Sequence, residues 1–320
     1  MNSLSKDSVN WLDVGPEGEG QRVDNFLHRI LKGVPKSHVY RILRSGEVRV
    51  NSRRADPTLR LQPGDRVRVP PIRIAAPASA GPVPTGGAAL PILYEDDALV
   101  AIDKPAGVAV HGGSGISHGV IERLRALRPT APFLELVHRL DRETSGVLML
   151  AKKRRALTQL HEQIRTGYTD KRYLAMVPGP WRSGAVTLDY PLAKHVLEGG
   201  DRRVTVSADG QEAATRVRIE RSLPGYTLLE ARLLTGRTHQ IRVHLAHAGA
   251  PICGDDKYGD FELNRRLARE GLKRMFLHAA RFRCSHPITG EPLEIVAPLP
   301  PDLERFVRSL GAAPAKGQRP

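Results

Sequence analysis

The sequence predicts an α+β protein that has a small basic amino-terminal domain and a larger mixed domain. Its 320 residues exceed what a single core usually holds, so two domains are expected. The stretch from Pro70 to Leu90 is rich in Ala, Pro, Gly and Ser, with too little apolar bulk for a core and too much proline for regular structure. We therefore predict a tail at 1–19, a small domain at 20–72, a linker at 73–90, a larger domain at 91–310 and a flexible basic tail at 311–320.

The small domain is predicted to contain two short helices followed by short strands. The first helix follows from apolar residues at helical spacing, namely Val23, Phe26, Leu27, Ile30 and Leu31. The second begins after Pro35, with Ser37 as a candidate N-cap. Strands are indicated by the alternation around Val48 and Val50 and around Val67 and Val69, the latter after a Gly64-Asp65 turn.

The charge of the chain favours a polyanionic partner. Lys and Arg number 49 against 34 acids, a formal net charge of +15, and cations release counterions when they bind nucleic acid. Lys36, Arg41 and Arg44 fall off the apolar positions of the second helix and can share one solvent face that meets phosphate. A basic charge that serves only solubility, or a membrane surface as partner, are the alternatives. Residues 1–11 do not form a signal peptide and no apolar run reaches membrane-spanning length, so we expect a cytoplasmic protein without a membrane partner.

The amino-terminal segment resembles the alpha-L RNA-binding module of small-subunit ribosomal protein four. The resemblance covers Gly20 to Val69 and is carried by GQRVDNFL, PKSHVYRILRSGEVRVN and LQPGDRV. It implies that this domain binds RNA, and the alternative is a solvated basic face without a partner.

The larger domain alternates short apolar strands with amphipathic helices. Examples are a strand at Leu99–Asp103, a helix at Ala156–Ile164 and a strand at Tyr173–Val177. No GxGxxG or GxxxxGK[ST] phosphate loop is present, so no nucleotide cofactor is indicated. Cys253 and Cys284 lie far apart without CxxC spacing, which argues against a zinc site and a disulfide scaffold.

A dense polar cluster, HRLDRETSG, spans His138 to Gly146 between two apolar runs and is expected to form a loop that joins strands. Loops held by a rigid sheet often carry reacting groups. Asp141 lies between Arg139 and Arg142, whose charge favours the carboxylate form, and an ionised carboxylate can act as nucleophile or base. Taken alone, the pattern also fits a structural ion pair.

A second cluster, TGRTHQIRVHLAHAG, spans Thr235 to Gly249 and predicts a short helix with Thr238 as N-cap and Gly249 as stop. Arg242 lies one turn after His239, so a rigid helix can direct its cation toward an anionic centre. The histidines of this cluster raise the possibility of a metal site. No HExxH pattern accompanies them and they lie at different angles around the helix, so we expect no metal.

Together these motifs resemble the RluA-type family of pseudouridine synthases from Gly20 to about Pro300. Besides HRLDRETSG, the resemblance is carried by DKPAGVAVHGG, KRYLAMV, GRTHQIRVH with PICGDDKYG, and LHAARFRCSHPITGEP, in the order the family has them. The commoner NKPAG of the family is DKPAG here, a departure that puts nothing catalytic in doubt.

The resemblance implies a mixed, largely antiparallel catalytic sheet, no cofactor, and a set of site residues. Asp141 is expected to be the nucleophile, paired with Arg242. Tyr173 is expected to pack on the target base and to help move protons, although from the sequence alone it can equally be a core tyrosine. Arg139 is expected to fill the space left by the flipped nucleotide. Further substrate contacts are expected from His138, Arg142, Arg237, His239 and Gln240.

The activity that the resemblance implies is the isomerisation of specific uridines to pseudouridine. The expected substrate is large-subunit (23S) ribosomal RNA or its assembly intermediate, and the enzyme is expected to act as a monomer. Two alternatives stay open, namely the same chemistry on transfer RNA, and a non-catalytic RNA-binding or ribosome assembly protein that retains the fold. The intact set of Asp141, Tyr173 and Arg242 argues against the second alternative.

Overall fold

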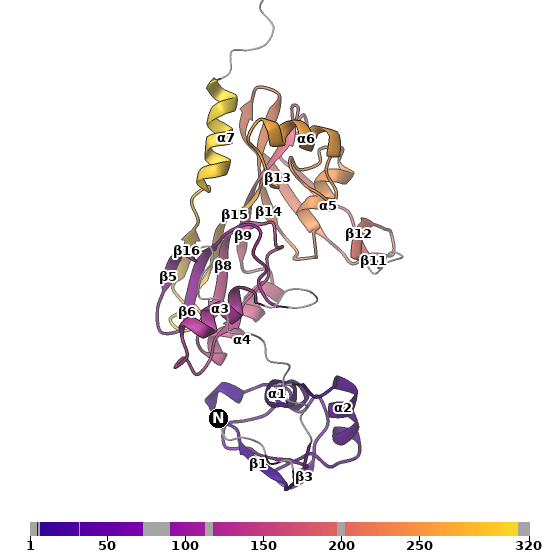
Figure 1. Ribbon diagram of the computed structural model, residues 1–320, viewed down its shortest axis with the longest axis vertical. Coiled ribbons are helices and arrows are strands. Elements are labelled where there is room, and N and C mark those ends of the chain that lie inside the picture. Colours follow the sequence, from indigo (N-terminus) through magenta and orange to yellow (C-terminus); the bar gives the residue numbers. More distant parts are fainter. Residues whose placement is uncertain are drawn as a thin grey trace, which may run out of the picture.

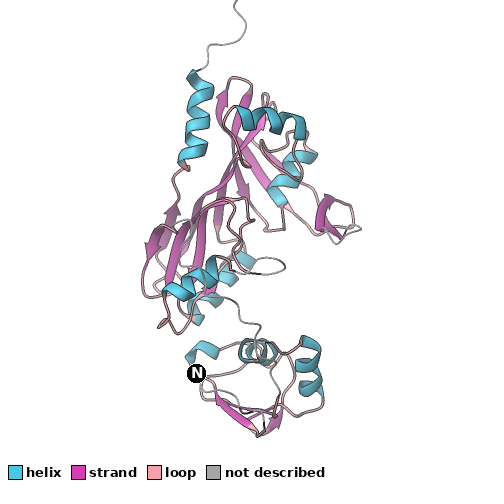
Figure 2. Ribbon diagram, viewed as in Figure 1, coloured by secondary structure: helices cyan, strands magenta, loops and turns pink. Residues whose placement is uncertain are grey.

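The computed structural model describes residue 5 and the ranges 7–31, 33–72, 90–112, 118–196 and 202–312. A small domain lies at one end of the molecule and a larger domain at the other (Figure 1). The predicted linker lies almost wholly outside the described residues, as does most of the predicted carboxy-terminal tail. Strands run through the middle of the larger domain and helices lie along its margins (Figure 2).

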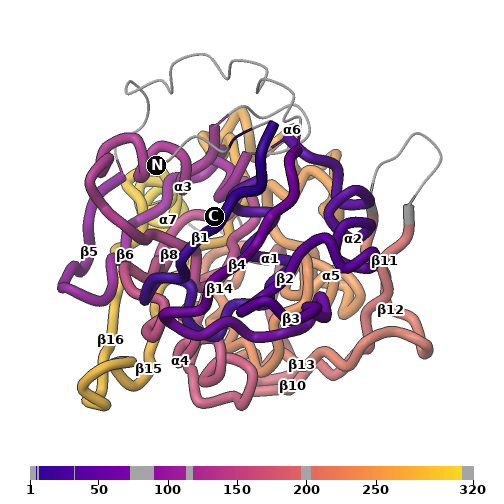
Figure 3. Tube along the Cα trace, turned by 90° about the horizontal axis from the view of Figure 1, so that it is seen from below, coloured from indigo at the N-terminus to yellow at the C-terminus, as the bar shows by residue number. Residues whose placement is uncertain are grey.

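The small domain packs two helices on a four-stranded antiparallel sheet. The helices are α1 (Val23–Ile30) and α2 (Lys36–Arg44). The sheet has the order β1-β4-β2-β3, formed by β1 (Asn10–Asp13), β2 (Arg49–Val50), β3 (Arg53–Arg54) and β4 (Arg66–Val69). In the view from the small domain's end its strands are foremost (Figure 3). The apolar residues predicted to face inward, such as Phe26, Leu27 and Val67, do form its core.

Two local expectations for this domain differ from the structure. Residues 10–18, expected as tail, form β1 and the short helix η1 (Pro16–Gly18), because Leu12 packs against the core while β1 pairs with β4. Helix α2 begins one residue before Ser37, with Pro35 at the N-cap position, since the backbone of Pro35 is already extended. The Gly46 and Gly64 turns have positive φ, as such turns require.

The larger domain is built on a ten-stranded mixed sheet. Its main path is β10-β13-β14-β9-β15-β8-β6-β5, with β16 on β15 and β7 on β8. These strands are β5 (Ile92–Glu95), β6 (Leu99–Lys104), β7 (Glu135–Leu136), β8 (Ser145–Ala151), β9 (Asp170–Pro178), β10 (Val186–Asp189), β13 (Ala214–Leu223), β14 (Tyr226–Leu233), β15 (Leu277–Ser285) and β16 (Pro292–Val296). Among the described pairs only β15 with β8 is parallel, so the expected, largely antiparallel sheet is confirmed.

Both faces of the central strands are buried. In β8, Leu148 and Leu150 contribute to one core, which helix α3 (Val120–Leu127) covers. Val147 and Met149 contribute to the opposite core, which helix α4 (Arg154–Arg165) covers. The remaining elements of the domain are helices α5 (Gln240–His247), α6 (Phe261–Arg269) and α7 (Pro301–Ala312), and a separate hairpin of β11 (Leu192–Val196) and β12 (Arg202–Val206). Helix α7 ends two residues inside the stretch expected as tail.

The parallel junction of β8 and β15 requires a glycine. Gly146 pairs with Ala279 and has a φ of +109°. A Cβ atom at this position would lie 2.2 Å from the carbonyl oxygen of Ala279. The HRLDRETSG segment therefore leads into β8 at a position where only glycine, which has no Cβ atom, allows the backbones of β8 and β15 to approach this closely.

Candidate active site

The loop that carries Asp141 runs from β7 into β8 and is fixed by a buried lysine. The side chain of Lys104 is fully buried, and its ammonium donates hydrogen bonds to the carbonyl oxygens of Pro105 and Val108 at 2.8 Å and of Arg142 at 3.0 Å. The amide of Gly107 donates to the same Arg142 carbonyl at 2.9 Å. The backbone next to Asp141 is thus tied to the DKPAG segment.

Arg242 lies on α5, whose start differs from the prediction. The helix begins at Gln240 and its N-cap is His239 in the left-handed conformation (φ 53°), not Thr238. The cause is Gln240, whose buried amide bridges the turn to β13. Its oxygen accepts from Thr235 at 2.7 Å and from the Arg237 amide at 2.9 Å, and its nitrogen donates to Thr215 Oγ1 and the Ala214 carbonyl. The helix stops, as predicted, before Gly249.

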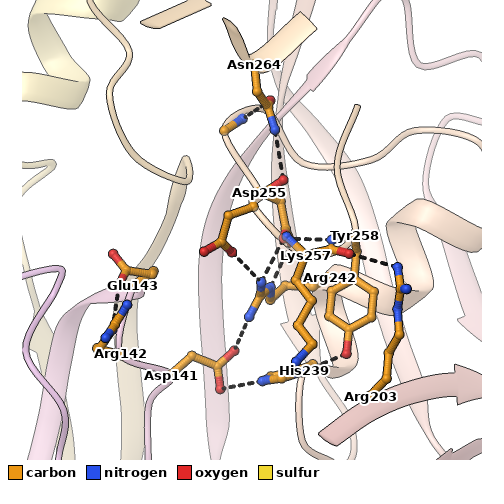
Figure 4. Close-up of polar contacts among 12 residues, drawn as sticks. Asp141, Arg142, Glu143, Arg203, His239, Arg242, Asp255, Lys257, Tyr258 and Asn264 are labelled. Carbon is orange, nitrogen blue, oxygen red and sulfur yellow. Dashed lines mark hydrogen bonds and ion pairs between the residues drawn. The ribbon is translucent and has the colours of Figure 1, made fainter. Parts of the chain in front are cut away.

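Arg242 is held by carboxylates from two segments. Its Nε and Nη2 atoms donate to the two oxygens of Asp255 at 2.7 Å each, a bidentate pair inside the protein. Nη2 also lies 3.3 Å from Asp256, and Nη1 lies 3.5 Å from Asp141 Oδ2 (Figure 4). Asp255 thus fixes one edge of the guanidinium and leaves the other edge for Asp141.

Charge and burial set the protonation of this group. Burial alone would raise the pKa of Asp255, but the hydrogen bonds and charge of Arg242 outweigh it and lower that pKa. Burial likewise opposes the charge of Arg242, yet its hydrogen bonds with Asp255 raise its pKa above the ordinary value. Both groups stay ionised at neutral pH, so Asp141 always faces a cation.

His239 and Tyr173 complete the surroundings of Asp141. His239 Nε2 lies 3.9 Å from Asp141 Oδ1, while its Nδ1 is 2.8 Å from the Tyr258 hydroxyl. Burial lowers the pKa of His239, which keeps the ring neutral near pH 7. Burial, and then the charge of Asp141, raises the pKa of Tyr173 on β9, so its phenol keeps its proton. Asp141 remains accessible from the cavity, with 27% of its side chain exposed.

These groups line a cavity of about 1040 Å³. Asp141, Tyr173 and Arg242, predicted from separate motifs, all line it. Its wall includes the apolar side chains of Val110, Leu136, Leu233, Ile241 and Leu277. A space with partly apolar walls and an accessible carboxylate beside a fixed guanidinium can hold a planar base and present a nucleophile to it.

The other predicted substrate contacts divide into two groups. Arg139, Arg142 and Arg237 are exposed at the edge of the cavity. Arg142 pairs with Glu143 at 2.8 Å and Arg237 donates to the Glu212 carbonyl, whereas Arg139 has no ion pair among the described residues. By contrast, the hydrogen-bonding groups of Gln240 are taken up within the protein, which leaves none for the substrate contact expected of it.

His138 also has an internal role. Its ring stacks on Phe282 with centroids 5.2 Å apart, and its Nε2 accepts from the Met149 amide at 3.2 Å. Burial, and then the charge of Lys171, lowers the pKa of His138 to about 4. The ring is a neutral support of the loop, and contact with a substrate stays a prediction for it.

Sequence reasoning did not single out Asp255, Lys104 or Lys171. Asp255 occurs in the motif PICGDDKYG, Lys104 in DKPAG and Lys171 in KRYLAMV, but the sequence analysis assigned no role to any of the three. For Lys104 and Lys171 the available signal was a charged side chain in an apolar strand motif, because a buried charge needs a partner or a function. No group of three His, Cys, Asp or Glu side chains suited to a metal occurs in the part of the chain that the structure describes. The described helices include none long and apolar enough to cross a membrane.

Comparison with known proteins identifies the class. Residues 98–247 match the RNA pseudouridylate synthase family, and residues 21–67 match the S4 domain. The chain belongs to the RluA-type pseudouridine synthases, as its motifs predicted, and carries an amino-terminal S4 domain.

Particular relatives cover nearly the whole chain. The chain is 52% identical to ribosomal large subunit pseudouridine synthase C of Salmonella typhimurium and of Escherichia coli K12, over 95% of this chain and 97% of each relative. Among solved structures it is similar to human RNA pseudouridylate synthase domain containing 4, with 28% identity and a TM-score of 0.56 over 69% of this chain and 93% of that one.

Proposed function

We propose that this enzyme isomerises uridines of large-subunit ribosomal RNA to pseudouridine, with Asp141 as the nucleophile. The observation that carries the proposal is one cavity in which the Asp141 carboxylate faces a fixed guanidinium beside a buried tyrosine. The choice of RNA is supported by the names of the relatives that are 52% identical over nearly full length. Such a substrate places the enzyme in the cytoplasm, where it acts on free RNA or on an assembling particle.

The reaction exchanges one bond of the base for another. The bond from ribose C1′ to uracil N1 breaks and its electron pair leaves with the base, while a carboxylate oxygen of Asp141 bonds to C1′. The base turns, C5 attacks C1′, and the Asp141 carboxylate leaves. Loss of the C5 proton and protonation of N1 complete the exchange, so no atom is gained and no redox cofactor is needed.

The residues around Asp141 have distinct tasks in this reaction. Arg242 contacts the Asp141 carboxylate and directs it at the cavity, because Asp255 fixes the other edge of the guanidinium. The phenol of Tyr173 offers a face on which the base can lie. The apolar wall keeps water from the detached base.

The uridine must first leave its stack, which costs a few kcal/mol. Stacking on Tyr173 offsets part of that cost. Arg139 is exposed beside the cavity without an ion pair in the described structure, so its guanidinium is free to occupy the position that the base vacates. This supports the role that the family resemblance implies for it.

The S4 domain supplies a surface for the RNA backbone. Lys36, Arg41 and Arg44 are exposed on α2, and none of the three pairs with an acid within the described residues. Arg41 contacts His38, and Arg44 donates to the Tyr40 carbonyl, so both guanidinium groups lie along the helix surface. Unneutralised cations on one helix face suit phosphate contacts that position an RNA without reading its bases.

The decisive experiment is the exchange of Asp141 for asparagine. Asn keeps the shape of the side chain but cannot bond covalently to C1′ as a carboxylate does, so pseudouridine formation in ribosomal RNA should be abolished while RNA binding stays. An exposed turn carboxylate provides the matched control, Asp209→Asn, which should keep the normal rate. Normal conversion by Asp141→Asn would exclude the nucleophile assignment.

Mapping pseudouridines in a deletion strain decides the substrate. Loss of modifications from large-subunit RNA supports the proposal, loss from transfer RNA moves the same chemistry to that substrate, and an unchanged map indicates a non-catalytic RNA-binding protein.

A further inference from the structure

Lys171 lies deep in the cavity, on the same strand face as Tyr173. The two residues are two positions apart on β9, so their side chains point the same way, and both line the cavity. Only 9% of Lys171 is exposed. Its ammonium has no hydrogen bond or ion pair among the described residues, and a Cβ atom at Gly236 would be 3.7 Å from it.

Three other buried or largely buried cations among the described residues of the domain have partners. Lys104 donates to three carbonyl oxygens, Arg242 contacts three carboxylates, and Arg274 donates to Ser145 at 2.7 Å and lies 3.8 Å from Asp302. The Nζ atom of Lys171 is not among the fully enclosed polar atoms of the described residues, so this ammonium on a largely buried side chain reaches the cavity and has no anion there. Lys171 is therefore a group whose partner arrives with the substrate.

The position of Lys171 indicates which part of the substrate it meets. Lys171 pairs with Leu233 and Tyr173 pairs with Ala231 in the ladder between β9 and β14, so the two side chains are neighbours on one face of the sheet and both line the cavity. The exposed arginines at the edge of the cavity suit the phosphates. A base on Tyr173 with its ribose at Asp141 would have a carbonyl edge within reach of the Lys171 ammonium.

We propose that the Lys171 ammonium binds a carbonyl oxygen of the flipped uracil and stabilises the negative charge that this base acquires during catalysis. This inference rests on the proposed function. When the C1′–N1 bond breaks, its electron pair leaves with the base and spreads from N1 to the O2 and O4 oxygens. If Asp141 instead adds to C6, the C5=C6 electron pair shifts to O4. On the second route the C1′–N1 bond then breaks and leaves its electron pair on N1, so both routes pass through a base with negative charge on a carbonyl oxygen. When C5 bonds to C1′, the Asp141 carboxylate is displaced from C1′ on the first route; on the second route the N1 electron pair then expels it from C6. Lys171 keeps its proton throughout, acting as a fixed cation at developing charge.

Lys171→Met tests the inference, because methionine keeps the length of the side chain without its charge. With enzyme in excess over RNA, the single-turnover rate constant should fall about 100-fold or more, as for the loss of one oxyanion donor. The dissociation constant of the RNA and its salt dependence should stay within about twofold. The melting temperature should stay equal or rise, because an unpaired buried charge has been removed.

Two further variants sharpen the result. Lys273→Met removes an exposed lysine outside the cavity and should leave rate and binding unchanged. Lys171→Arg keeps a cation and should recover part of the lost rate. Three results overturn the inference: a normal rate for Lys171→Met, a loss of binding with a shallower salt slope, which indicates a phosphate contact, or unfolding, which indicates a structural role. If the unaltered enzyme forms no pseudouridine in ribosomal RNA, the proposed function fails instead.

Discussion

Exchanging Asp255 for asparagine removes the charge that neutralises Arg242 inside the protein. Asp255 is fully buried, and both its oxygens accept from the guanidinium at 2.7 Å. Its Oδ1 also accepts from the amides of Lys257 and Tyr258 at 2.9 and 3.0 Å. Asparagine offers one acceptor where the site needs two and turns an NH₂ group toward Arg242.

The expected loss is that of a broken buried ion pair, about 3–5 kcal/mol of unfolding free energy. For a domain of this size each kcal/mol lowers the melting temperature by about 2–4 °C, which gives a decrease of about 6–20 °C. The chain offers a matched control in Asp256, the next residue, which lies 3.3 Å from the same guanidinium but is 71% exposed. Asp256→Asn removes a surface pair worth at most about 1 kcal/mol.

Thermal unfolding of the two variants, followed by circular dichroism, measures the difference. Single-turnover assays at a temperature where both are folded should show a loss of at least about tenfold for Asp255→Asn, because Arg242 is no longer fixed beside Asp141. Equal melting temperatures for the two variants would refute the view that Asp255 is the anchor of Arg242. A stable but inactive Asp255→Asn would instead give Asp255 a role in chemistry.

Three further outcomes are expected. Gly146→Ala should lower the unfolding free energy by about 3 kcal/mol or more, because the added Cβ atom would collide with the Ala279 carbonyl at a residue with positive φ. A melting temperature within 2 °C of that of the unaltered protein, measured by calorimetry, would contradict this steric argument. The double variant Arg41→Gln with Arg44→Gln should weaken RNA binding and flatten its salt dependence, measured by titration at several salt concentrations, and unchanged binding at low and high salt would count against the S4 surface. Burial lowers the pKa of His278 to about 4, so below pH 6.5 the unfolded chain binds more protons than the folded chain. The free energy of unfolding measured in urea should therefore fall by about 2 kcal/mol between pH 7 and pH 5, and a His278→Asn variant should lose this part of the pH dependence.

Much of the site could be predicted from the sequence because its main loop and its helix are each specified by residues that are contiguous in the chain. HRLDRETSG is bounded by apolar runs, and the helix with Arg242 has its own stop at Gly249. The start of that helix was predicted less well. Thr238 has the chemistry of an N-cap, but the tertiary hydrogen bonds of Gln240 to β13 move the start to His239.

The residues that sequence reasoning missed depend on contacts between distant segments. Asp255 follows Arg242 by 13 residues, and no helical or strand period relates the two. Lys104 binds the carbonyl of Arg142, 38 residues away, through a backbone group that carries no sequence signature. For Gln240 the family resemblance implied substrate contact, whereas its hydrogen bonds to Thr215 and the Ala214 carbonyl occupy its amide inside the protein.

The place of β15 in the sheet affects how the protein is made. Within the described strands, β9 and β8 do not pair, and β15 lies between them and joins the two halves of the sheet. During synthesis the half with Asp141 and the half with Arg242 have both left the ribosome before residues 277–285 appear. The two halves of the sheet therefore cannot be joined before residues 277–285 are available. We expect Asp141 and Arg242 to reach their final positions only when β15 enters the sheet.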